Sequence, residues 1–147
     1  MQTYTIGQTA EKTGLTVSTL RYYEKEGLLP FVDRTSGGQR VFKDSDFNWL
    51  SIIECLKSTG VPIRDIRQYI DWCMEGDTTL AQRRGLFVRQ KERVEAQIAA
   101  LQQHLDKIEY KIWYYDRAIE RGTEGTQPSN CGILEEEYRR LRAQDAL

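Results

Sequence analysis

The first part of the chain alternates between short amphipathic segments and glycines that can end them. Thr5 and Gln8 have the spacing of a capping box, which predicts a short helix that ends at Gly14. Thr16 can cap a second short helix, and Gly27 is placed to end it. Two short helices joined by a tight glycine-containing turn are typical of a helix-turn-helix unit.

A β-hairpin and a third helix are predicted next. The segments 32–34 and 40–42 flank a turn over 35–39, whose glycines permit the positive φ angles that a tight turn needs. Asp44 is placed to cap a helix over about 45–58. The apolar residues expected on the buried face of that helix are Trp49, Ile53 and Leu56.

A heptad repeat occupies residues 80–119, after a fourth helix predicted over about 63–74. At 1.5 Å per residue this helix is about 60 Å long, which is too long to bury its apolar stripe against the small helices before it. The same helix of a second chain is the simplest partner, so we predict a coiled-coil dimer. Because Arg84 and Lys91 occupy early seam positions, the tight seam is expected to begin near Val94.

These elements predict a mainly α fold in three parts. They are a winged helix-turn-helix DNA-binding domain with its helix pair over 1–77, a dimerisation helix over 78–121, and a loop with a short amphipathic helix over 122–147. No apolar run reaches the roughly 20 residues that span a membrane, and the N-terminal residues lack the pattern of a secretion signal. We therefore expect a cytoplasmic protein.

Four polar side chains form one stripe on the second helix. Ser18, Arg21, Tyr22 and Lys25 recur at the i, i+3, i+4 and i+7 positions and so lie on one face. Hydroxyl and cationic groups of this kind bind phosphates and base edges of DNA. The neighbouring Thr19 belongs to the same candidate surface. The stripe predicts a helix that enters the major groove, with the hairpin as a wing on the flanking backbone.

The overall charge does not support this prediction. The formal net charge is −1, and residues 1–77 carry 9 basic against 11 acidic side chains. A basic surplus is the usual footprint of a nucleic-acid-binding protein. The prediction therefore depends on where the basic residues lie, and the few phosphate contacts of one unit require two copies of it for useful affinity.

Four motifs resemble the MerR family of transcription regulators, namely YTIGQTA, TLRYYEKEGLL, RTSGGQRVF and KSTGVPIRDI. The order of the elements is also similar, and the resemblance covers residues 4 to about 120. It implies a homodimer with an antiparallel coiled coil that binds a near-palindromic site in double-stranded promoter DNA. Such a dimer bends and untwists the DNA, and so acts on RNA polymerase indirectly through the promoter.

The resemblance also implies roles for residues of the second helix. Ser18 and Arg21 are the expected major-groove contacts, and Tyr22 is expected to reach a phosphate. Tyr23 follows as in the family motif and is expected to be partly in the core. Simple packing of both tyrosines is the alternative.

In the wing, Arg34 and Arg40 are expected to bind backbone phosphates, and Gly38 allows the DNA to approach closely. A solvated loop is the alternative for the two arginines. Gln39 stands where the commoner members of the family have an aromatic residue, so its contact with DNA stays open.

Cys55, on the third helix, is the candidate effector site. The family's subgroup that responds to aldehydes or other electrophiles resembles this chain in a lone cysteine there and in the length of its tail. A reactive thiolate needs positive surroundings, but Lys57 points elsewhere around the helix, so activation must come from a tertiary neighbour or the partner subunit. A small core residue is the alternative. Cys73 is expected in the core, and Cys131 in a loop.

Other classes of function are less well supported. A soft-metal site needs at least two thiolates or a thiolate and an imidazole, whereas the three cysteines are widely spaced. A cysteine-dependent enzyme needs a base beside the thiol, and the single histidine, His104, lies on the heptad helix. We expect no enzymatic activity, no cofactor and no metal. A metal-responsive regulator of the same family and a DNA-architectural accessory protein with the same winged fold stay as alternatives.

Overall fold

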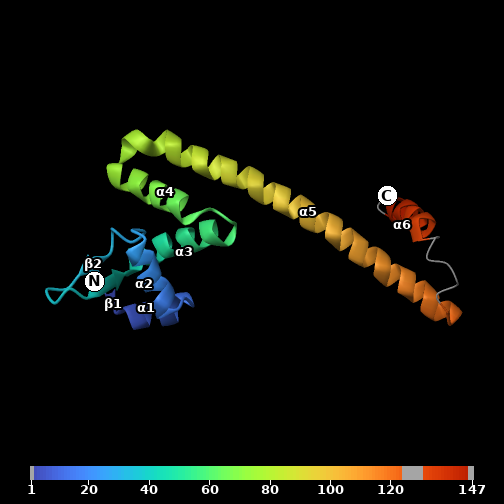
Figure 1. Cartoon of the computed structure of the whole chain (residues 1–147), viewed down its shortest axis with the longest axis horizontal. Helices are drawn as coiled ribbons and strands as arrows, with labels where there is room; N and C mark the ends of the chain where they lie inside the picture. Colours follow the sequence, from blue (N-terminus) through green and yellow to red (C-terminus); the bar gives the residue numbers. More distant parts are fainter. Residues whose placement is uncertain (1, 124–130, 146–147) are drawn as a thin grey trace. The chain divides into compact units, whose positions relative to one another are not determined.

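The computed structural model describes residues 2–123 and 131–145, which are mainly α-helical with one small antiparallel sheet (Figure 1). The chain forms two compact units, residues 1–94 and 95–147. The long helix α5 (Leu80–Arg121) contributes residues to both. The mainly α class and the long helix after a winged helix-turn-helix are therefore confirmed. None of the described helices is long and apolar enough to cross a membrane.

Helix α1 (Ile6–Thr13) begins at the predicted capping box. The Thr5 hydroxyl oxygen accepts from the Gln8 backbone N–H at 3.2 Å, and the Gln8 side-chain oxygen accepts from the Thr5 backbone N–H at 2.9 Å. The helix ends at Gly14, whose φ of 74° places it in the left-handed region that glycine adopts without strain. The local sequence thus fixes both ends of this helix.

Helix α2 (Val17–Lys25) is capped by Thr16, whose hydroxyl oxygen accepts from the Thr19 backbone N–H at 3.0 Å. Leu20 and Tyr23 point into the core and are fully buried. Because these two residues anchor one face of the helix, the opposite face is left for solvent or a ligand.

The wing is the hairpin of β2 (Asp33–Arg34) and β3 (Arg40–Lys43), in which Arg34 is opposite Arg40. The short strand β1 (Thr3–Tyr4) pairs with the other edge of β3, which gives the antiparallel order β1-β3-β2. The hairpin was predicted, but β1 was not, because a strand of two residues is too short for a periodic pattern.

Helix α3 (Asp44–Ser58) begins one residue earlier than predicted, and its cap is different. The carboxylate of the buried Asp46 accepts from the Lys43 backbone N–H at 3.0 Å. Asp44, the predicted cap, instead accepts a hydrogen bond from the Tyr4 hydroxyl at 2.9 Å. The Asp44 assignment was wrong because the first turn of α3 has two aspartates, Asp44 and Asp46, that can cap it. The contact of Asp44 with Tyr4 of β1 leaves the cap to Asp46.

The core of the first unit lies between the sheet, α1, α2, α3, α4 (Ile63–Glu75) and the first part of α5. Ile53 and Leu56 are buried as predicted, and Leu50 replaces Trp49 as the third buried residue of α3. Trp49 is half-buried and stacks on Phe31, with ring centroids 5.0 Å apart. The other buried apolar residues of this core are Tyr4, Ala10, Leu20, Tyr23, Leu28, Leu29, Val32, Phe42, Val61, Ile66, Ile70 and Leu86.

In the second unit, α6 (Cys131–Asp145) packs on the last part of α5 through aromatic rings. Tyr138 lies with its ring centroid 5.7 Å from that of Tyr110 and 5.6 Å from that of Trp113. Arg142 forms an ion pair of 2.9 Å with Glu109. The predicted tail helix is therefore present and folds back onto α5.

Candidate nucleic-acid interface

The predicted stripe on α2 faces away from the core. Ser18, Arg21 and Lys25 are exposed, and 43% of Tyr22 is accessible to solvent. Thr19 is half-buried at the first turn, where its hydroxyl oxygen lies 2.8 Å from that of Thr16. The stripe thus presents a guanidinium, an ammonium and two hydroxyl groups on one side of a short rigid helix.

Tyr23 belongs to the core rather than to this stripe. Its ring is fully buried, and its hydroxyl donates a hydrogen bond to a carboxylate oxygen of Glu54 on α3. The Lys57 ammonium lies 5.2 Å from the centre of the ring. Burial, supported by the bond to Glu54, raises the pKa of Tyr23. A DNA contact by this side chain is not supported, because none of its surface is accessible.

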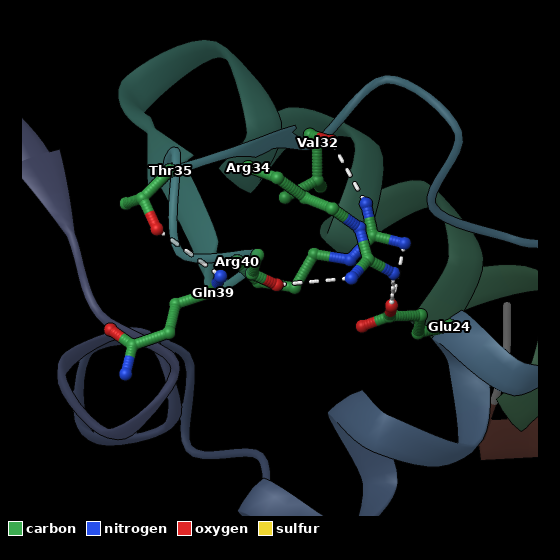
Figure 2. A network of polar contacts seen from close by, with 7 residues as sticks. Glu24, Val32, Arg34, Thr35, Gln39 and Arg40 are labelled. Carbon is green, nitrogen blue, oxygen red and sulfur yellow. Dashed lines mark hydrogen bonds and ion pairs between the residues drawn. The ribbon is translucent and has the colours of Figure 1, made fainter.

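The turn of the wing is held by its own backbone. The Thr35 N–H donates to the Gln39 carbonyl at 2.8 Å, and the Gly38 N–H donates to the Thr35 carbonyl at 2.9 Å. The Thr35 hydroxyl oxygen also accepts from the Gln39 N–H at 3.2 Å. Gly38 has a φ of 83°, so this turn needs glycine there for conformational reasons. The Gln39 side chain is exposed and points away from the arginines of the wing (Figure 2).

The two arginines of the wing meet at one carboxylate, as Figure 2 shows. The Oε1 atom of Glu24 lies 2.5 Å from Nη2 of Arg34 and 2.6 Å from Nη2 of Arg40. Each guanidinium also donates to a backbone carbonyl of the wing, Arg34 to Gly38 and Arg40 to Val32, both at 3.0 Å. The wing is therefore joined to the end of α2 by charged groups.

Glu24 was not among the residues selected from the sequence. It lies on α2 three positions after Arg21, in a motif whose hydrogen-bond donors were the candidate DNA contacts. Nothing in the spacing along the chain shows that it reaches residues 10 and 16 positions away, because that contact depends on how the hairpin folds back. The hydrogen bond from Arg40 lowers the pKa of Glu24, so the carboxylate stays charged down to pH values below its ordinary range.

Cys55 lies on the exposed side of α3, so it is not the small core residue that was the alternative. Its carbonyl accepts from the Thr59 hydroxyl at 2.8 Å, and the Thr59 hydroxyl oxygen in turn accepts from the Gln90 amide on α5 at 2.7 Å. Cys73 is half-buried. Cys131 is the first residue of α6 rather than a loop residue as predicted, and its side chain lies outside those that the structure describes. Within the described ranges, no three His, Cys, Asp or Glu side chains gather in a way that could hold a metal ion.

Comparison with known proteins identifies the family. Residues 4–72 match the sequence model of the MerR HTH family regulatory proteins, and residues 47–110 match that of the MerR DNA-binding region. An uncharacterised HTH-type transcriptional regulator from Haemophilus influenzae is 45% identical over 121 residues, which are 82% of this chain and 90% of the relative. The chain belongs to the MerR family. It is therefore a DNA-binding transcription regulator and not an enzyme.

Solved structures of MerR proteins agree with this fold. The structure of HiNmlR, described as a MerR family regulator lacking the sensor domain and bound to promoter DNA, has 43% sequence identity and a TM-score of 0.77. It covers 86% of this MerR chain and all of its own. A MerR family transcriptional regulator from Listeria monocytogenes has 27% identity and a TM-score of 0.75, and it covers 97% of this chain and 98% of its own.

The two adjacent tyrosines of α2 should respond differently to loss of the hydroxyl group. Tyr23→Phe removes a buried bond to a carboxylate, so we expect a loss of about 1–3 kcal/mol in unfolding free energy, measured by urea denaturation at one fixed protein concentration. Tyr22→Phe should leave stability within about 0.5 kcal/mol and should weaken DNA binding in fluorescence anisotropy. A loss of DNA affinity in Tyr23→Phe with unchanged stability would contradict this assignment.

Proposed function

We propose that this chain acts in the cytoplasm as a homodimer that binds and distorts promoter DNA. Helix α2 enters the major groove of one half-site, and the wing lies on the neighbouring backbone. The observation that carries this proposal is the pair of ion pairs from Glu24 to Arg34 and Arg40. They hold the exposed stripe of α2 and the wing together as one surface. The complex of HiNmlR with promoter DNA supports the binding of promoter DNA by this chain.

Within this surface the side chains divide by chemistry. Arg21 and Ser18 read base edges, since a guanidinium pairs with guanine and a hydroxyl adapts to several bases. Tyr22 donates to a phosphate. Arg34 and Arg40 provide the charged contacts to the backbone, because their guanidinium groups have donors beyond those used within the wing. The half-buried Thr19 and the exposed Gln39 complete the candidate surface.

The exposed seam of α5 supports the homodimer. Ile98, Leu101 and Ile112 are 60%, 66% and 57% accessible in the single chain, although they are large and apolar. Leaving such a stripe in water costs free energy in proportion to its area. A second copy presents an identical stripe, so an antiparallel pair of α5 helices covers both. The other exposed apolar residues of this seam are Leu105, Ile108, Tyr115 and Ile119.

Two joined copies can also deform DNA. Each head binds one half-site, and the dimer fixes the distance between the heads, so the DNA must bend or untwist where its own spacing differs. The cost of this deformation depends on sequence and is repaid by the contacts of the second head. RNA polymerase then responds to the altered geometry of the promoter rather than to a direct contact with the regulator.

Cys55 is the proposed site of the signal. Its side chain is exposed on α3, next to Glu54, which holds Tyr23 of the recognition helix. With an aldehyde, the thiolate sulfur adds to the carbonyl carbon and the carbonyl oxygen takes up a proton, which gives a hemithioacetal without an oxidant or a leaving group. Lys57 is turned toward the Tyr23 ring, so the positive charge that favours the thiolate comes from another neighbour, such as the partner subunit.

Replacing Arg21 tests the DNA-reading role. Arg21→Ala should weaken binding to a duplex selected by the wild-type protein by about 1–3 kcal/mol, and should relax the preference at one base position. Arg121→Ala, which removes the same charge from the second unit, is the control. Anisotropy titrations check both variants, and equal affinities for Arg21→Ala and wild type would remove this residue from the interface.

A charge in the seam tests the dimer. Leu101→Glu should give monomers in sedimentation velocity, because it places two carboxylates in an apolar interface. Its DNA affinity should fall, and the dependence of affinity on salt should become about half as steep, since half of the phosphate contacts are lost. Gln103→Glu adds the same charge on the same helix and should remain dimeric. A dimeric Leu101→Glu protein would exclude this seam as the interface.

Removing the thiol tests the sensor. Cys55→Ser should bind DNA as the wild type does but should no longer change reporter transcription when formaldehyde is added. Cys73→Ser is the matched control and should respond normally. Mass spectrometry of the treated wild type should locate the adduct on Cys55. A Cys55→Ser protein that still responds to formaldehyde would refute the thiol-sensor proposal without affecting the DNA-binding proposal.

A further inference from the structure

We propose that Glu24 is a positioning residue that determines how well the protein distinguishes its operator from other DNA. It acts by fixing Arg34 and Arg40 of the wing relative to the recognition helix α2. The inference rests on the proposed mode of DNA binding, and it adds an acidic residue to a surface otherwise described by its donors.

Glu24 connects α2 to the wing through two arginines, each of which is also bound to the backbone of the wing. One carboxylate oxygen of Glu24 lies within 2.6 Å of a guanidinium nitrogen from each arginine. The second Nη atom of each arginine is bound to a carbonyl of the wing itself. Each guanidinium therefore bridges the wing backbone and α2, and Figure 2 shows both of them converging on Glu24.

This arrangement differs from an ordinary surface ion pair. The side chains of Glu24 and Arg40 are only 23% and 18% accessible, whereas that of Arg34 is 52% accessible. Exposed pairs contribute little because solvent screens them and because two long side chains must be ordered. Here Arg40 is the more shielded of the two arginines, and Arg34, held by the same oxygen, is more open to a phosphate.

The connection through Glu24 affects specific and non-specific binding in opposite directions. Two guanidiniums with one carboxylate carry one net positive charge instead of two, which weakens the sequence-independent attraction to phosphates. Ordering the arginines before binding lowers the entropy that is lost when they contact a DNA of the right shape. Without the carboxylate, both side chains are free to follow the backbone of any duplex, so discrimination falls.

Two variants separate position from charge. Glu24→Gln removes the charge, and Glu24→Asp keeps the charge but shortens the side chain by one methylene, so that it no longer reaches both arginines. Glu26→Gln, two residues further on, removes a nearby charge as the matched control. Dissociation constants are measured over a range of salt concentrations for a duplex selected by the wild type and for a scrambled duplex. The fraction of each protein that is active in DNA binding is determined by stoichiometric titration.

For Glu24→Gln we expect the ratio of operator to scrambled affinity to fall roughly 5- to 30-fold. Binding to scrambled DNA should become tighter, with a salt slope steeper by about 0.9 for each added phosphate contact. For Glu24→Asp the ratio of operator to scrambled affinity should fall as well, while the affinity for scrambled DNA stays near that of the wild type. Glu26→Gln should raise both affinities together and keep the ratio.

Two results would overturn the inference. If Glu24→Asp keeps the wild-type ratio of operator to scrambled affinity, only the charge of Glu24 matters. If Glu24→Gln has the same ratio as Glu26→Gln, Glu24 does not position the arginines. Failure of the wild type to select any sequence from a random pool would instead refute the proposed function. The two failures are therefore distinguishable.

Discussion

The attachment of α2 to the core is the constraint on which the DNA-binding surface depends. Leu20 and Tyr23 are fully buried, and the Tyr23 hydroxyl is bound to Glu54 of α3. A helix of nine residues is marginal by itself in water, so tertiary packing must hold it. Because the buried face fixes the rotation of the helix, the stripe of Ser18, Arg21, Tyr22 and Lys25 faces outward.

The parts of the fold that follow from local rules could be predicted. Caps such as Thr5 with Gln8, glycine stops such as Gly14, and the heptad of α5 depend on residues a few positions apart, which a sequence displays directly. The cap of α3 and the two-residue strand β1 depend on contacts between elements, and these were missed or misassigned. Local spacing predicts elements well and predicts the partners of charged residues poorly.

For the candidate DNA-binding surface, too, local spacing predicted some residues, whereas others depend on contacts between elements. Helical periodicity placed Ser18, Arg21 and Tyr22 on one exposed face. It did not decide between the core and the surface for Tyr23, because the residue directly follows the exposed Tyr22 and its partner Glu54 is on another helix. Glu24 escaped notice for a related reason: an acidic residue argues against DNA binding until the two arginines that it holds are seen.

The shared carboxylate of Glu24 also constrains how this surface can evolve. Arg34, Arg40 and Glu24 depend on one another, so single changes at these positions interact strongly and useful alternatives require simultaneous changes. In the described part of the chain, the ion pairs and hydrogen bonds of this triad join its members to one another and to the carbonyls of Gly38 and Val32, not to the side chains of Ser18 or Arg21. Base-reading positions can therefore vary through single substitutions while the wing stays intact, which gives descendants of this chain a short mutational route to new operator sequences.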